Sequence, residues 1–302
     1  MSGIPPYGMH YLDGAIDCHV HACPHLNARS ADVFQAVRDA ADAGMKAIGL
    51  MDNFQNSSGF AALAMRELGH LGVEVFGGVI MQPVAGGVTI ETARTAIGYG
   101  YGPGTGARFV SLPTHHTRAV AEREGRSAAF LETTFQVPLE GPIQDDLAAI
   151  MDLCAEHDVV FDCGHVSGPE AVRLCQEAKA RGVARVRTHC ARAELADIEA
   201  IVATGAYAEF SFFLLSHATQ IGLTHVDHEK HRIEGITIGE LVPRIRAAGE
   251  RAIVSSDAGV YLLAPPVETF REYMLLLEGG GFSPEEIRRM NTTNPAALFR
   301  IG

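Results

Sequence analysis

Eight short apolar runs, each followed by a helix-like segment, constrain the fold of this chain more than any other feature. The runs are continuous rather than alternating, as expected for strands that are buried on both faces of a parallel sheet. They lie near residues 12–20, 46–51, 73–79, 108–113, 159–163, 184–188, 207–213 and 252–256. Eight such units in 302 residues, 47% of them hydrophobic, predict an α/β fold, a single-domain (β/α)8 TIM barrel over residues 1–302. A doubly wound open sheet is the alternative, but it would separate the first and last strands.

The net charge of −12 excludes partners that need clustered basic residues. Only three lysines occur, so we expect neither nucleic acid nor an anionic membrane surface as a partner. No stretch reaches the roughly 18 consecutive apolar residues of a membrane span. We therefore expect a cytoplasmic protein that acts on a small molecule. Because outer barrel helices often pair, we also expect a homo-oligomer.

The first apolar run ends in Asp17-Cys18-His19-Val20-His21. Side chains alternate faces along a strand, so His19 and His21 must project to the same side. That arrangement puts two imidazoles within reach of one metal ion. Taken alone, the pair is also consistent with two polar residues at a strand end.

Three later runs also end in a possible ligand or proton carrier. His165 follows the fifth run, His189 the sixth and Asp257 the eighth. The carboxyl ends of barrel strands meet at one mouth, so these side chains should face the pair on the first strand. Packing alone does not explain why each of these runs stops on such a residue.

Imidazole and carboxylate groups suit zinc, manganese, iron or nickel, and three or four of them around an open position are typical of a catalytic site. The metal would lower the pKa of bound water and supply hydroxide at neutral pH. Asp257 could accept the proton of that water and pass it to a leaving group. A histidine on a neighbouring strand could polarise the carbonyl under attack.

This ordered set resembles the amidohydrolase superfamily, and the closing segment Asn294-Pro-Ala-Ala-Leu-Phe299 is similar to its C-terminal signature. The resemblance implies that His19, His21 and Asp257 bind one metal and that Asp257 shuttles the proton. In the one-metal branch, His165 completes the ligand set and His189 helps to activate water or polarise substrate. In the two-metal branch, His165 and His189 would hold the second ion.

The end of the fourth strand departs from the two-metal pattern. That branch usually places a bridging lysine or a glutamate there, whereas this chain has Leu112-Pro113-Thr114-His115-His116. We therefore favour one divalent ion, with zinc as the first choice and manganese, iron or nickel as alternatives. His115 and His116 are substitutes that keep a second ion open, and exposed loop positions are the other interpretation of both.

Substrate-binding candidates lie in the loops around the expected mouth. His25 and Arg29 follow the first strand closely enough to bind a substrate carboxylate or carbonyl, and His115 and His116 follow the fourth. Long segments after strands four and seven, at 114–141 and 214–236, suit a cover over a partly apolar pocket. The second segment carries four histidines, which we interpret as lid surface: His217, His225, His228 and His231.

These features predict a metal-dependent hydrolase that cleaves a small amide, cyclic amide, lactone or related ester with a metal-activated water. The resemblance also permits a metal-dependent non-oxidative decarboxylase. A non-catalytic metal-containing binding barrel is the third possibility, but it leaves the aligned His and Asp residues without a purpose.

Overall fold

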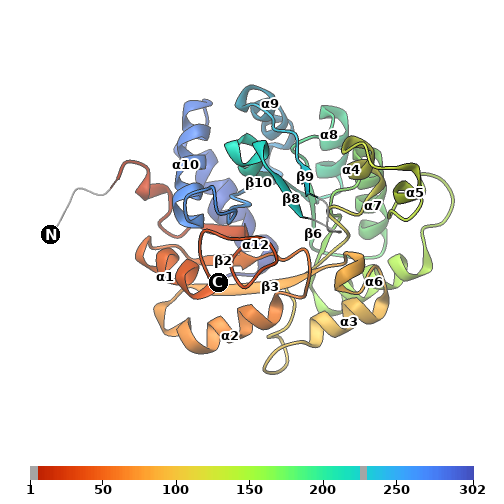
Figure 1. The fold of residues 1–302 in the computed structure, drawn as a ribbon, viewed down its shortest axis with the longest axis horizontal. Coiled ribbons are helices and arrows are strands. Elements are labelled where there is room, and N and C mark those ends of the chain that lie inside the picture. The colour runs from red at the N-terminus through yellow and green to blue at the C-terminus, as the bar shows by residue number, and fades with distance from the viewer. Residues whose placement is uncertain (1–5, 225–229) are drawn as a thin grey trace.

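Eight parallel strands form one sheet whose order follows the chain. The computed structural model describes residues 6–224 and 230–302. The strands of this sheet are β1 (Ile16–Val20), β2 (Ala47–Leu50), β3 (Glu74–Ile80), β4 (Phe109–Ser111), β5 (Val160–Asp162), β6 (Val186–His189), β7 (Tyr207–Ser211) and β10 (Ala252–Ser255). Helices surround these strands (Figure 1).

The first and last strands of this sheet approach each other and close the barrel. Val20 and Ala258 form a parallel bridge, and the His21 amide donates to the Ala258 carbonyl at 2.8 Å. The Ser256 amide donates to Asp17 Oδ1 at 3.0 Å. The predicted (β/α)8 barrel is therefore confirmed, while the single-domain extent over residues 1–302 stays a prediction.

The outer layer consists of helices that follow the strands in turn. They are α1 (Val33–Asp42), α2 (Ser58–Leu68), α3 (Ile90–Gly98), α6 (Asp145–His157), α7 (Gly168–Ala180), α8 (Leu195–Ala203), α9 (Ile238–Ala248) and α10 (Pro266–Gly279). In α1, the buried residues Val33, Ala36, Val37 and Ala40 lie at helical spacing and form its inward face. Within the described ranges, every helix is too short or too polar to cross a membrane.

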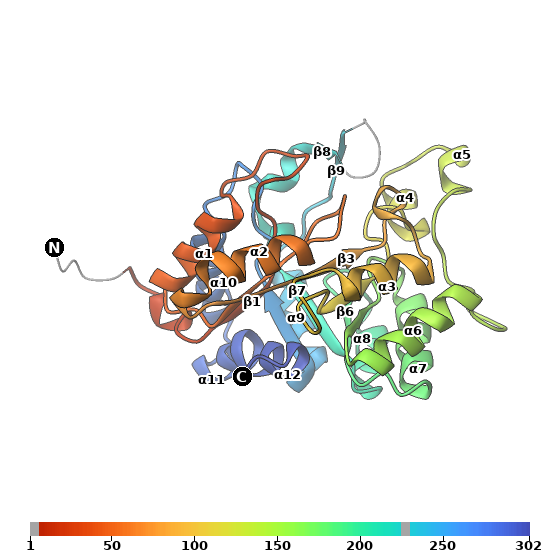
Figure 2. The ribbon, with the colours of Figure 1, turned by 90° about the horizontal axis from the view of Figure 1, so that it is seen from below.

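The chain ends in α11 (Pro284–Arg288) and α12 (Asn294–Phe299), and α12 closes the amino-terminal end of the barrel. Leu298 and Phe299 are buried in one cluster with inward residues of the strands, including Phe76 and Phe109. The rings of Phe76 and Phe299 lie 4.5 Å apart. Figure 2 shows α12 at one end of the molecule and the β8–β9 hairpin at the other.

Both long segments expected after the fourth and seventh barrel strands are present, and both carry secondary structure of their own. The segment after β4 contains α4 (Arg118–Arg123) and α5 (Ala128–Leu131). The segment after β7 contains the antiparallel strands β8 (Gly222–Thr224) and β9 (Lys230–Arg232). These segments lie at the end of the barrel opposite α12 (Figure 2).

A buried ion network fills the barrel interior above the apolar layer. Arg187 on β6 is fully buried, and its guanidinium lies 5.6 Å from the Phe109 ring centroid and 5.5 Å from that of Phe299. Arg187 Nε donates to Asp162 Oδ2 at 2.9 Å, and Nη1 lies 2.9 Å from Glu209 Oε2. Burial lowers the pKa of Arg187, but the two carboxylates outweigh it and raise the pKa above its ordinary value. Arg187 therefore remains charged and holds both acids ionised.

We expect Arg187→Met to destabilise the protein by about 3–5 kcal/mol, because it leaves two carboxylates buried without their cation. Arg181→Met is the matched control, since Arg181 pairs with Asp152 and Glu177 at the surface and should contribute at most about 1 kcal/mol. Urea unfolding followed by circular dichroism measures both. Equal free energies of unfolding for the two variants would show that the network does not stabilise the barrel.

Candidate metal centre

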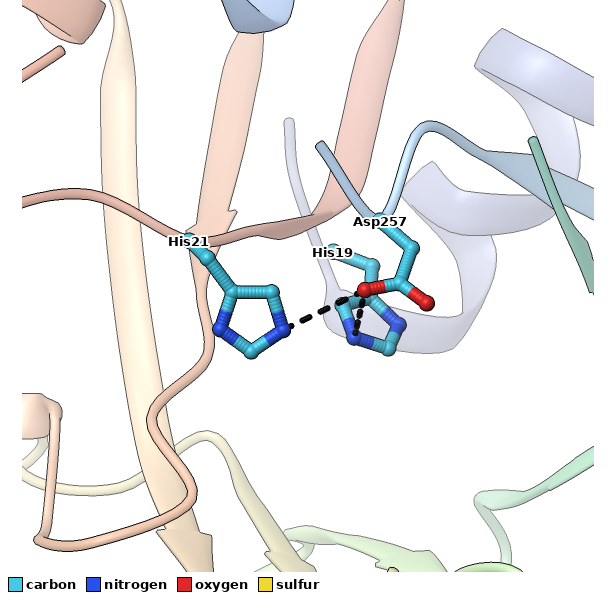
Figure 3. A group of neighbouring side chains, drawn as sticks. All are labelled: His19, His21 and Asp257. Atoms are coloured by element: carbon cyan, nitrogen blue, oxygen red, sulfur yellow. Dashed lines mark ion pairs between the residues drawn. The ribbon is translucent and has the colours of Figure 1, made fainter. Parts of the chain in front are cut away.

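Two histidines and one aspartate meet at the carboxyl end of the barrel. His19 Nε2 and His21 Nε2 each lie 3.2 Å from Asp257 Oδ1 (Figure 3). The three ligand atoms lie within 4.8 Å of one another, which is the spacing that one cation could bridge. Two imidazoles and a carboxylate are a donor set that zinc and related divalent ions accept, so the residues present fit such an ion.

The backbone around Asp257 is shaped to place its carboxylate against the end of β1. Asp257 has a φ of 48°, a left-handed conformation that costs energy in a residue other than glycine. Gly259 has a φ of 135°, and a Cβ there would lie 1.8 Å from the His21 carbonyl oxygen. Only glycine permits this approach, so position 259 helps to bring Asp257 to the two histidines.

Glu209 fixes the orientation of the His19 ring through its Nδ1 atom. His19 Nδ1 donates to Glu209 Oε1 at 2.9 Å, and Ser255 Oγ donates to the same oxygen at 2.5 Å. A proton on Nδ1 leaves the lone pair of Nε2 directed toward Asp257, the tautomer that a metal ligand requires. Burial lowers the pKa of His19, but Asp257 and Glu209 outweigh it and raise the pKa to about 9. A cation bound at Nε2 would displace the added proton.

His21 and His165, the other two histidines of the expected ligand set, are neutral. Burial lowers the pKa of His21 to about 4 and that of His165 to about 3. Both imidazoles are therefore unprotonated at neutral pH, in the form that binds metal. Burial raises the pKa of Asp257, but His19 and His21 outweigh it and bring the pKa below its ordinary value, so this carboxylate is ionised.

His165, His189 and His115 continue the row of imidazoles around the mouth. The His165 and His189 ring centroids lie 4.7 Å apart, and those of His115 and His165 lie 5.7 Å apart. A glycine again shapes the turn, because Gly164 has a φ of 64° and a Cβ there would lie 2.4 Å from the Pro113 carbonyl oxygen. All three histidines line the cavity that also contains His19 and Asp257.

A second group of possible ligands, His19, His189 and Glu209, also has its atoms within 4.8 Å of one another. His189 Nδ1 lies 3.8 Å from Glu209 Oε2, but this oxygen is 2.9 Å from Arg187. The other oxygen of Glu209 accepts from His19 and Ser255. Glu209 is thus already occupied by one cation and two donors, which disfavours a second metal ion here.

The structure separates the four residues expected to bind substrate. Arg29 and His115 line the cavity. His25 does not line it, and its ring lies 5.8 Å from that of His21 and 5.3 Å from that of Phe54.

His116 is directed toward the α5 segment instead. Its Nε2 lies 3.1 Å from Thr133 Oγ1, and its ring centroid lies 5.2 Å from that of Phe130. This position gives no support for His116 as a ligand or a substrate contact.

The histidines of the second long segment do not gather into a further described cluster. His217 Nε2 lies 3.1 Å from the Leu262 carbonyl oxygen, and His231 is on β9. His225 and His228 lie outside the described residues.

Three charged residues of the site were missed from the sequence: Asp162, Arg187 and Glu209. Each lies within an apolar run that predicts a buried strand. A charge in such a position needs a partner, because an unpaired buried charge is costly. That signal could have identified them as interior residues, although it could not have paired them.

The fold and the donor set together place this protein among the (β/α)8 barrels whose mouth could hold a divalent cation. The chain belongs to a family of unknown function, DUF6282, whose family model matches residues 14–209. No curated protein matches the sequence.

Several solved structures share the fold. An amidohydrolase from Pseudomonas aeruginosa is 12% identical over 99% of each chain, with a TM-score of 0.61. The phosphotriesterase homology protein from Escherichia coli is 16% identical, over 95% of this chain and 98% of the other, with a TM-score of 0.59. An organophosphorus hydrolase from Deinococcus radiodurans is 14% identical, over 88% and 82%, with a TM-score of 0.57. The resemblance to the amidohydrolase barrel is thus confirmed for the fold.

We expect Glu209→Gln to weaken zinc binding by about 10- to 100-fold, because the amide cannot hold the Nδ1 proton of His19 as a carboxylate does. Calorimetric titration of metal-free protein with zinc measures the affinity. Glu170→Gln is the control, since Glu170 is also a buried glutamate but accepts from the backbone of Val137 and Ser167. An unchanged zinc affinity in Glu209→Gln would contradict the orienting role.

Proposed function

We propose that this protein is a metal-dependent hydrolase of small molecules, with the cation held by His19, His21, His165 and Asp257. The observation that carries the proposal is the convergence of two histidine nitrogens on one oxygen of Asp257, each at 3.2 Å. The shared fold with an amidohydrolase and with an organophosphorus hydrolase supports the same class. Amides, cyclic amides, lactones and related esters are the substrates that we propose.

The bound cation would supply Lewis acidity, which brings the pKa of water close to neutrality. Asp257 is placed to take up the proton, because its carboxylate is ionised and its side chain is 20% exposed at the cavity. One carboxylate oxygen faces the histidines, which leaves the other to accept a proton and return it to the leaving group. His189 lies beside His165 in the cavity wall and is proposed to polarise the substrate carbonyl.

We propose one ion rather than two, and zinc as its most suitable identity. Asp162 and Glu209 lie 3.5 and 3.8 Å from His189, and both are paired with Arg187. The carboxylates beside His189 are therefore already engaged by a cation, which favours a single ion.

The cavity wall suits a substrate with an apolar part. Side chains after β7 supply an apolar wall that includes Phe213, Leu214 and Leu223, and Val260 follows β10. Part of the β8–β9 hairpin belongs to this wall, which agrees with the expected cover over the mouth.

Asp257→Asn should lower turnover by at least about 100-fold while the barrel stays folded, because the amide cannot accept the proton. Release of acid from a panel of lactones, amides and esters measures turnover, and circular dichroism measures folding. The exposed Asp145 provides a matched control, and Asp145→Asn should leave turnover unchanged. Full activity in Asp257→Asn would eliminate the proton-transfer role.

Removal of the metal with a chelator should abolish activity, and added zinc or manganese should restore it. The same panel should include carboxylated aromatics watched for carbon dioxide, which would indicate a decarboxylase that uses a similar set of ligands. Elemental analysis of the purified protein counts the ions for each chain. Undiminished activity in protein shown to be metal-free would rule out the proposed class.

A further inference from the structure

Arg29 is a cation in the cavity that the proposed hydrolysis does not use. It lies between β1 and α1, where it forms an antiparallel bridge with Val260, the segment that also carries Asp257. Its side chain lines the same cavity as His21 and Asp257. The charge of Arg29 contributes to lowering the pKa of His21, and Asp257 acts on the pKa of Arg29, so the guanidinium is close to the metal centre.

The guanidinium of Arg29 is poorly satisfied by the protein. Its Nε is buried and has no hydrogen-bond partner. No carboxylate of residues 6–224 and 230–302 forms an ion pair with it. The nearby Asp52 accepts from the Phe54 amide at 2.8 Å and from Gln55 Nε2 at 3.1 Å, and lies 3.8 Å from His25 Nε2. Burial lowers the pKa of Arg29 to about 10, which still leaves it cationic at neutral pH. Asp257 and Asp52 raise this pKa from a distance, but neither forms an ion pair with Arg29. A largely buried cation without an ion pair normally indicates that a partner is supplied from outside.

Arg29 and the Asn27 amide compete for hydrogen bonds to the ring of His25. Arg29 Nη2 lies 2.6 Å from His25 Nε2, while the Asn27 amide lies 3.0 Å from His25 Nδ1. Burial lowers the pKa of His25 to about 2, so its ring is neutral and can accept at only one of the two nitrogens. Arg29 and Asn27 therefore compete for one acceptor, and Arg29 loses little when it turns to a ligand.

A second donor faces the same cavity from the end of β2. Thr114 Oγ1 donates to Asn53 Oδ1 at 2.8 Å, and Gln82 Nε2 donates to Thr114 Oγ1 at 3.1 Å. This chain of hydrogen bonds uses the oxygen of the Asn53 amide and leaves its NH2 group as the donor. Asn53 and Arg29 both line the cavity, so this wall offers donors to an anion.

We infer that the cavity binds a carboxylate through Arg29, so that the substrate is a small carboxylic acid that carries the bond to be cleaved. A guanidinium matches the two oxygens of a carboxylate in a bidentate pair. That the bound acid is a substrate rests on the proposed hydrolase function, whereas the presence of a carboxylate site does not.

The test uses benzoate as the probe and benzamide as its uncharged equivalent of the same shape. Calorimetric titration of metal-free protein in the presence of a chelator measures both, because a carboxylate could otherwise bind the metal. Wild-type protein should bind benzoate at least tenfold more tightly than benzamide. Arg29→Gln should abolish this preference, and Arg29→Lys should retain part of it. Arg123→Gln is the control, since Arg123 also lines the cavity but is exposed, and it should preserve the full preference.

The outcomes separate this inference from the proposed function. Equal binding of benzoate and benzamide to wild-type protein, absence of benzoate binding, or a preference that survives in Arg29→Gln would each overturn the carboxylate site. Tighter binding of inorganic phosphate than of benzoate, lost in Arg29→Gln, would also overturn it in favour of a phosphate site. Zinc titration of the same samples tests the metal centre separately, so either conclusion can fail while the other stands.

Discussion

The pairing of Arg187 with Asp162 and Glu209 is the interaction on which the rest of the structure depends. All three side chains are buried inside the barrel, where a single unpaired charge would be far more costly than the completed network. The network joins β5, β6 and β7, and Glu209 extends it to His19 on β1. Three consecutive strands and the distant β1 are thus held in one arrangement by the pairing of these charges.

The same network sets the chemistry of the mouth. Because Arg187 keeps Glu209 ionised, Glu209 can hold the Nδ1 proton of His19 and direct Nε2 toward Asp257. Asp162 and Glu209 are paired with Arg187, whereas Asp257 is the carboxylate that His19 and His21 contact. The proposal of one ion, rather than two, follows from this division of the acidic groups.

Part of this site could be predicted from local patterns. The two-residue period of a strand places His19 and His21 on one face, and parallel strands bring His165, His189 and Asp257 to the same end. The structure shows these side chains around one cavity. Local patterns could not separate His115 from His116, because the direction of a side chain in a loop depends on the backbone on either side. They also missed Glu209, whose contact with His19 joins residues 190 positions apart.

The sequence by itself determined the alternation of strands and helices, the closed barrel and the end of the barrel at which the ligands would lie, because these follow from hydrophobic periodicity and strand direction. Tertiary structure alone decided which charges pair, which histidine nitrogen faces the mouth and that Arg29 forms no ion pair with the described part of the chain. Those properties depend on distances of a few ångströms between segments far apart in the chain, and on burial that only the folded barrel creates. Neither these distances nor this burial can be derived from the order of residues along the chain.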